Sequence, residues 1–132
     1  IKSEAKLQIA CVKWLSETYP DLKFVHVSNQ SSAQKGAEAR DAGYQKGHPD
    51  IFIYRARHGY HGLAVELKMP KGRVSKEQQE YLMLLREGGY LAVVAVGFEQ
   101  FKICVTDYIK PPKNEFEAFQ DLGRDLVNRL KR

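Results

Sequence analysis

Two acidic residues and a lysine stand within apolar segments of the chain. Asp50 follows Gly47-His48-Pro49 and opens the apolar run 51–54, while Glu66 and Lys68 belong to a later apolar run. A hard cation such as Mg²⁺ takes oxygen ligands, and it usually has only one or two protein carboxylates, which leaves room for water and phosphate. We therefore expect Asp50 and Glu66 to hold a divalent cation against a phosphate, with Lys68 beside the attacking water.

The alternation of residues 62–68 supports this arrangement, because it places Glu66 and Lys68 on the same face of a strand. Pro49 has no N–H and suits the position just before a strand that begins near Asp50. If the two strands are neighbours, Asp50 and Glu66 meet at one end of the sheet. An acid-x-lysine triplet or a Gly-x-Pro-Asp turn is common by itself, so the prediction depends on their combination.

This combination resembles the active-site signature of the PD-(D/E)xK nuclease superfamily and, more closely, the VRR-NUC (virus-type replication-repair nuclease) domain. The matching segments span about residues 4 to 96 and comprise Glu4-Ala5-Lys6-Leu7-Gln8, Gly47-His48-Pro49-Asp50, Glu66-Leu67-Lys68 and residues 75–82. The resemblance implies an α/β, restriction-endonuclease-like core in the order αβββαβ. A mixed central sheet would be flanked by helices and followed by two C-terminal helices.

The resemblance also implies roles for the site residues. Asp50, Glu66 and the main-chain carbonyl of Leu67 would hold Mg²⁺ or Mn²⁺, assisted by Glu4 directly or through water. Lys68 would orient a water and favour its hydroxide form, because a nearby ammonium stabilises developing negative charge. Gln78 would position the water or Lys68.

Two of these residues also have plausible structural roles. Glu4 lies on the apolar stripe of a helix expected over residues 3–17, where the helix dipole by itself favours an acid in the first turn. Gln8 is four residues on and could join the site. Ser75-x-x-Gln78 is a capping-box pattern, which accounts for Gln78 without catalysis, and Gln79 competes with it for the site role.

The basic residues favour a polyanionic partner. The chain has 21 Lys and Arg against 16 Asp and Glu, for a net charge of +5, and such an excess suits phosphates, although it is common. A polar segment over residues 30–46 and a loop near residue 72 are either solvated loops or backbone contacts, with one tyrosine able to stack on a base. The candidate DNA-binding residues are Lys35, Arg40, Tyr44, Lys46, Lys71 and Arg73.

Composition narrows the protein class. A chain of 132 residues with 43% hydrophobic and 28% charged residues is typical of one soluble globular domain, so we expect a single domain over residues 1–132. Cys11 and Cys104 indicate structural thiols in a reducing compartment rather than a disulfide, and no Cys/His cluster suggests zinc. No apolar stretch reaches membrane-spanning length, so we expect a soluble protein in the cytoplasm of a bacterial or phage-infected cell.

The remaining elements follow from periodicity and turn residues. We expect strands at 23–28, 51–54 and 62–68, a helix from Ser75 to Gly88, a buried central strand at 91–96 parallel to its neighbour, and two tail helices separated by Pro111-Pro112. His58 and His61 flank a turn and are expected to lie in solvent. His26 borders the expected site, although a structural histidine is the favoured interpretation.

The predicted function is metal-dependent endonucleolytic cleavage of DNA. The resemblance favours a homodimer that selects branched DNA, such as four-way (Holliday) junctions or flaps, in a DNA-repair or phage setting. One alternative is a non-catalytic DNA-binding module with an eroded nuclease site. A second alternative is a sequence-specific, restriction-type endonuclease, which the short chain disfavours because it has no separate base-reading domain.

Overall fold

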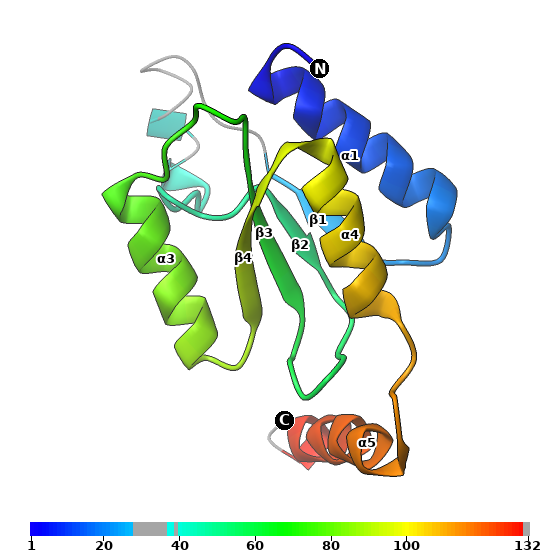
Figure 1. Ribbon diagram of the computed structural model, residues 1–132. Coiled ribbons are helices and arrows are strands. Elements are labelled where there is room, and N and C mark those ends of the chain that lie inside the picture. The colour runs from blue at the N-terminus through cyan, green and yellow to red at the C-terminus, as the bar shows by residue number, and fades with distance from the viewer. Residues whose placement is uncertain (28–36, 39, 131–132) are drawn as a thin grey trace.

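The computed structural model describes residues 1–27, 37–38 and 40–130, and for residues 124–129 it describes the backbone alone. A four-stranded mixed sheet forms the centre of the protein (Figure 1). Its strands, in spatial order, are β1 (Phe24–His26), β2 (Ile51–Ile53), β3 (Leu63–Lys68) and β4 (Leu91–Val96). β1–β2 and β2–β3 pair antiparallel, whereas β3 and β4 pair in parallel.

The helices α1 (Glu4–Thr18), α3 (Lys76–Glu87) and α4 (Gly97–Ile109) flank this sheet, and α5 (Glu115–Leu130) follows α4. The parallel pairing of β3 and β4 requires a crossover connection, and α3 supplies it. The predicted order αβββαβ with two further helices is therefore confirmed, as is the mixed sheet flanked by helices.

The prediction that residues 91–96 form a central strand is wrong, because β4 lies at the edge of the sheet and β2 and β3 are central. The apolar composition of β4 has a different cause: α3 and α4 pack on its two faces, which buries Ala92 and Ala95 and leaves the other residues half-buried. Arg86 also reaches its backbone, since Nε donates to the carbonyl oxygen of Ala92 at 2.9 Å, and covering polar main-chain groups in this way discourages edge-to-edge pairing.

The hydrophobic core lies mainly between the sheet and the pair α1 and α4, which cover one face together (Figure 1). The stripe Leu7, Cys11 and Leu15 on α1 is fully buried there, as the helical spacing predicts. Alternate residues of β3 point to this core, and the others face α3, where Ala64, Leu82 and Ala92 form a second cluster. Cys11 and Cys104 are both free thiols.

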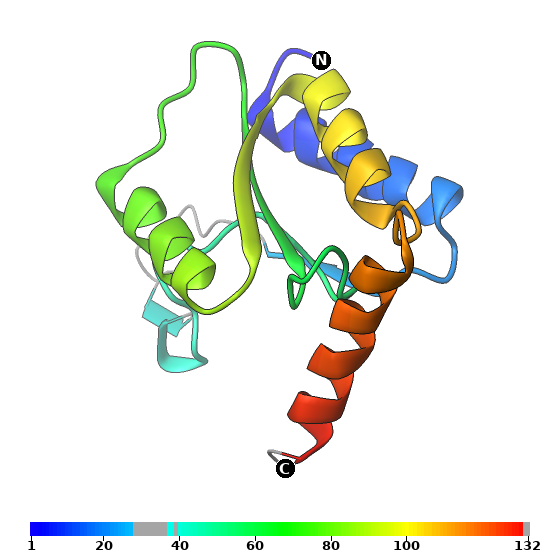
Figure 2. The ribbon, with the colours of Figure 1, turned by 60° about the horizontal axis from the view of Figure 1, so that its bottom comes forward.

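α5 lies apart from the sheet, below the β2–β3 connection (Figures 1 and 2). Two contacts join it to that connection: the ring of His58 bonds the Glu117 carboxylate, and the Gly59 N–H donates to Asp121 Oδ1 at 3.0 Å. His58 Nε2 also donates to the Tyr108 carbonyl oxygen at 3.0 Å. The prediction that His58 and His61 lie in solvent is wrong, since both are half-buried. The sequence of a turn does not reveal which other segments pack against it.

Within the part of the chain that the structure describes, no helix is both long and apolar enough to cross a membrane.

Candidate active site

Three carboxylates from three separate segments converge at one end of the two central strands. Antiparallel pairing of β2 with β3 places Ile51 opposite Val65, so the start of β2 lies beside the end of β3 and brings Asp50 next to Glu66. The first turn of α1 contributes Glu4. One oxygen from each of Glu4, Asp50 and Glu66 lies within 4.8 Å of the other two.

Asp50 is held in one orientation through both of its oxygens. The Leu67 N–H donates to Oδ2 at 2.7 Å, and Gln8 Nε2 donates to Oδ1 at 3.1 Å. His26 Nε2 donates in turn to Gln8 Oε1 at 3.2 Å, which fixes the amide so that its nitrogen faces Asp50. The helical spacing of Glu4 and Gln8 hinted at the Gln8 contact, but nothing in the sequence pointed to the Leu67 N–H.

Glu66 is buried to 1% exposure, and its two oxygens have different surroundings. Oε1 accepts from Gln78 Nε2 at 2.9 Å and lies 3.5 Å from Lys68 Nζ, whereas Oε2 is buried without a hydrogen-bond partner among the described residues. Burial, and after it the neighbouring Asp50 carboxylate, raise the pKa of Glu66 to about 8 against the opposing effect of Lys68.

This donor set fits a hard divalent cation. Buried carboxylates are costly unless a positive charge compensates them, and Lys68 supplies only one such charge. Glu66 belongs to the carboxylate cluster, and its Oε2 is buried without a hydrogen-bond partner among the described residues, as an oxygen that serves as a metal ligand would be. The oxygen ligands and the absence of sulfur and imidazole from the cluster suit Mg²⁺ or Mn²⁺ rather than zinc.

Gln78 occupies the site while it also caps α3. Its Oε1 accepts from the Ser75 N–H at 2.9 Å, and its own N–H donates to Ser75 Oγ at 3.2 Å, so the predicted capping box is present. The amide nitrogen remains available and donates to Glu66. Gln79 instead donates to the carbonyl oxygen of Val74 at 3.3 Å, so of the two glutamines it is Gln78 that reaches the carboxylates.

A glycine lets the loop that carries Asp50 pack against α3. Gly47 has φ of +89°, and a Cβ at this position would lie 2.6 Å from the carbonyl oxygen of Glu77. Any side chain would therefore be strained by its backbone conformation and would also collide with the first turn of the helix. Tyr81 adds a second link, because its hydroxyl donates to Gln45 Oε1 at 2.8 Å. The loop and the helix that bears Gln78 are thereby held together.

A model of the VRR-NUC domain family matches residues 2–99, a range that contains Glu4, Asp50, Glu66, Lys68 and Gln78. The chain belongs to the VRR-NUC family. A solved structure described as a VRR_NUC domain protein has a similar fold, with a TM-score of 0.67 and 26% sequence identity over 83% of this chain and 91% of that one. A comparison with curated protein sequences gives no match. Family membership indicates a nuclease-type function.

The basic residues predicted to contact DNA are placed unequally in this VRR-NUC domain. Arg40, Lys71 and Arg73 are exposed. Lys46 Nζ lies 3.5 Å from Glu77 Oε1, which gives it a partner on α3. The ring of Tyr44 is half-buried and packs edge-on against His48 with centroids 4.7 Å apart. Lys35 lies outside the described residues.

The two neighbouring glutamines allow a matched test of the α3 contact. We expect Gln78→Ala to lower the cleavage rate about tenfold to a hundredfold, because Glu66 loses the donor that orients Oε1. Gln79→Ala should leave the rate unchanged, since Gln79 reaches only a main-chain carbonyl. Initial rates at saturating metal measure both. Gln78→Glu retains a side-chain acceptor for the capping box, so if it restores the rate, helix capping alone explains the loss.

Proposed function

We propose that this VRR-NUC domain is a metal-dependent DNA endonuclease. The observation that carries the proposal is the cluster of Glu4, Asp50 and Glu66 beside the buried amine of Lys68. Asp50, Glu66 and the main-chain carbonyl of Leu67 would hold Mg²⁺ or Mn²⁺, with Glu4 bound directly or through water. A cation there would polarise a phosphoryl oxygen and make a bound water more acidic.

The protein side chains have separate tasks in this reaction. Lys68 holds the attacking water and stabilises the negative charge that develops as the water loses its proton. Gln78 occupies Glu66 Oε1 and thereby leaves Oε2 for the metal, while Gln8 and the Leu67 N–H fix Asp50. The water oxygen bonds to phosphorus in line with the departing 3′ oxygen. The P–O3′ bond breaks, the proton lost by the attacking water passes to solvent, the 3′ oxygen takes a proton from solvent, and the products carry a 5′-phosphate and a 3′-hydroxyl.

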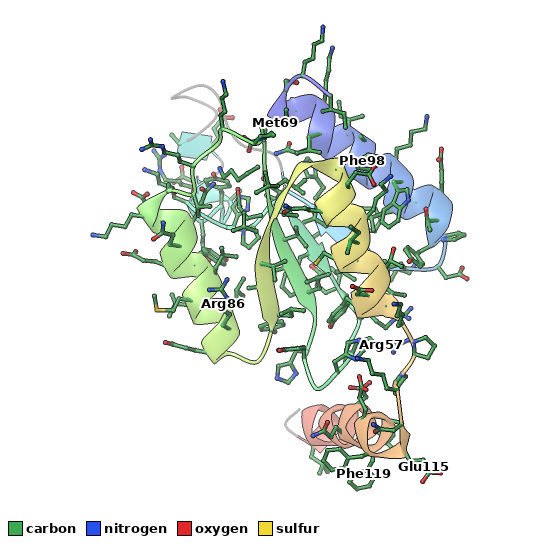
Figure 3. All side chains as sticks on the ribbon, viewed as in Figure 1. Arg57, Met69, Arg86, Phe98, Glu115 and Phe119 are labelled. Atoms are coloured by element: carbon green, nitrogen blue, oxygen red, sulfur yellow. The ribbon has the colours of Figure 1, made fainter. Side chains whose placement is uncertain are left out.

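We further propose a homodimer acting on branched DNA. One site cuts one strand, whereas resolving a four-way junction requires two cuts, which two copies would supply. α5 offers an apolar surface for a second copy, because Phe116 and Phe119 are each 70% exposed. Figure 3 shows Phe119 on the side of α5 away from the sheet.

A panel of labelled DNA substrates tests the proposed function. Duplex, flap, single-stranded and four-way-junction DNA are incubated with the purified protein, with and without Mn²⁺, and light scattering on the same preparation gives the oligomeric mass. We expect nicks near the branch point whatever the sequence, only with metal, from a particle of twice the single-chain mass. Binding without nicking would support the non-catalytic alternative, and discrete bands from long linear duplex would support the restriction-type alternative.

A further inference from the structure

A row of aromatic side chains extends from the carboxylate cluster along the same face of the sheet. Phe52 of β2 pairs with Ala64 of β3, two residues before Glu66, and paired residues of an antiparallel sheet share a face. Tyr54 follows two residues later on that face. Tyr54 is therefore about 13 Å from the level of Glu66 at about 3.3 Å per residue.

The rings of this row are in contact with one another. The centroid of Phe52 lies 5.0 Å from that of Tyr54 and 5.3 Å from that of Tyr90, and His61 lies 5.4 Å from Tyr90. We call these four residues the aromatic row. Tyr54 at its end is 59% exposed, which is high for a ring that lies beside other rings on a sheet.

The sheet face around Tyr54 is open among the described residues. α3 packs mainly on β4, and Phe52 packs against the cluster of Ala64, Leu82 and Ala92 under this helix, so the open part of the face begins at Tyr54. Val25, which pairs with Phe52, is 38% exposed. The register also places Lys23 opposite Tyr54, with the Tyr54 N–H donating to the Lys23 carbonyl oxygen at 3.0 Å, and Lys23 is exposed. The Lys23 side chain thus starts on the same face of the sheet as the exposed ring.

We propose that the aromatic row binds the bases of a single-stranded DNA segment leading away from the cleavage site. The inference rests on the proposed function, because the row is continuous with that site on one face of the sheet. Unpaired bases stack on aromatic side chains regardless of sequence, whereas the bases of a duplex already stack on each other. The rise of about 13 Å along the strands from the level of Glu66 to Tyr54 corresponds to about four bases at the duplex spacing of about 3.4 Å. Lys23 would contact a phosphate of the same strand.

The exposed end of the row permits a test that leaves the fold and the carboxylates intact. Tyr54→Ala is compared with Tyr60→Ala, a control in which an exposed tyrosine outside the row is removed from the β2–β3 connection. Fluorescence anisotropy in chelator measures binding to a thymidine homopolymer and to a blunt duplex. We expect Tyr54→Ala to weaken homopolymer binding about tenfold and to leave duplex binding unchanged. Tyr60→Ala should change neither. Tyr54→Trp should retain the affinity, with indole fluorescence quenched by the homopolymer.

Wild-type homopolymer affinity in Tyr54→Ala, or an equal loss of affinity for duplex, would overturn the proposal. Cleavage of the substrate panel by the wild-type protein is scored separately. If the wild-type protein cuts but Tyr54→Ala binds the homopolymer normally, the proposed single-strand binding is refuted and the proposed nuclease activity is supported. If the wild-type protein never cuts but Tyr54→Ala no longer binds the homopolymer, the proposed nuclease activity is refuted and the proposed single-strand binding is supported.

Discussion

Asp50→Asn, Glu66→Gln and Lys68→Met each lower the cleavage rate by about 10³-fold or more, if these residues act as proposed. The three substitutions retain side-chain size at positions that are almost fully buried, so the fold is expected to survive. Asn and Gln remove a negative ligand from the cluster, and Met removes the ammonium that stabilises the attacking hydroxide. Single-turnover nicking of the preferred substrate in saturating Mn²⁺ gives the rates.

Exposed residues of α3 supply matched controls for these variants. Glu80→Gln and Lys76→Met make the same chemical changes in solvent, and we expect wild-type rates from both. Anisotropy should show that all five proteins still bind DNA. Wild-type cutting by any one of the three site variants, or wild-type cutting that persists in chelator, would refute the assignment of that residue or of the metal.

Glu66→Gln should also stabilise the metal-free protein at high pH. The pKa of Glu66 is raised from 4.5 to about 8 by burial and by Asp50, so the folded state retains a proton that the unfolded state releases. Between these pH values the folded protein binds more protons, and stability is lost as pH rises through about 8. Gln carries no charge to desolvate. We expect it to raise the free energy of unfolding at pH 8.5 by about 2 to 4 kcal/mol, with little change at pH 4.5.

Urea unfolding across this pH range, in chelator, measures the difference. The wild-type protein should lose stability relative to Glu66→Gln as pH increases, and added Mn²⁺ should restore wild-type stability while affecting the variant little, because metal binding stabilises only the state that binds it. Glu80→Gln, at an exposed position, should follow the wild-type profile. Parallel pH profiles for wild-type protein and Glu66→Gln would show that the charge of Glu66 does not destabilise the metal-free protein. Charge compensation at Glu66 could then no longer be used as an argument for a bound metal.

Local sequence patterns determined most of the fold and the central part of the site. The alternation of residues 62–68 correctly placed Glu66 and Lys68 on one face of β3, because a strand repeats every two residues whatever surrounds it. The start of α3 at Ser75 and Gln78 was equally visible, since a capping box uses only side chains and backbone within one turn. Such features depend only on residues that are close together in the sequence, so they can be predicted without knowing the tertiary structure.

Tertiary structure alone decided which separate elements meet. Glu4 had an equally good explanation as a helix-dipole acid until the packing of α1 brought it to Asp50 and Glu66. The edge position of β4 could not be inferred from its apolar residues, because an edge strand with helices packed on both faces has the same apolar composition as a central strand. The partners of His58 and the alignment of Phe52 and Tyr54 with Glu66 likewise depend on strand register and helix docking. Strand register and helix docking are set by the free energy of packing distant segments together, and local periodicity does not predict this free energy.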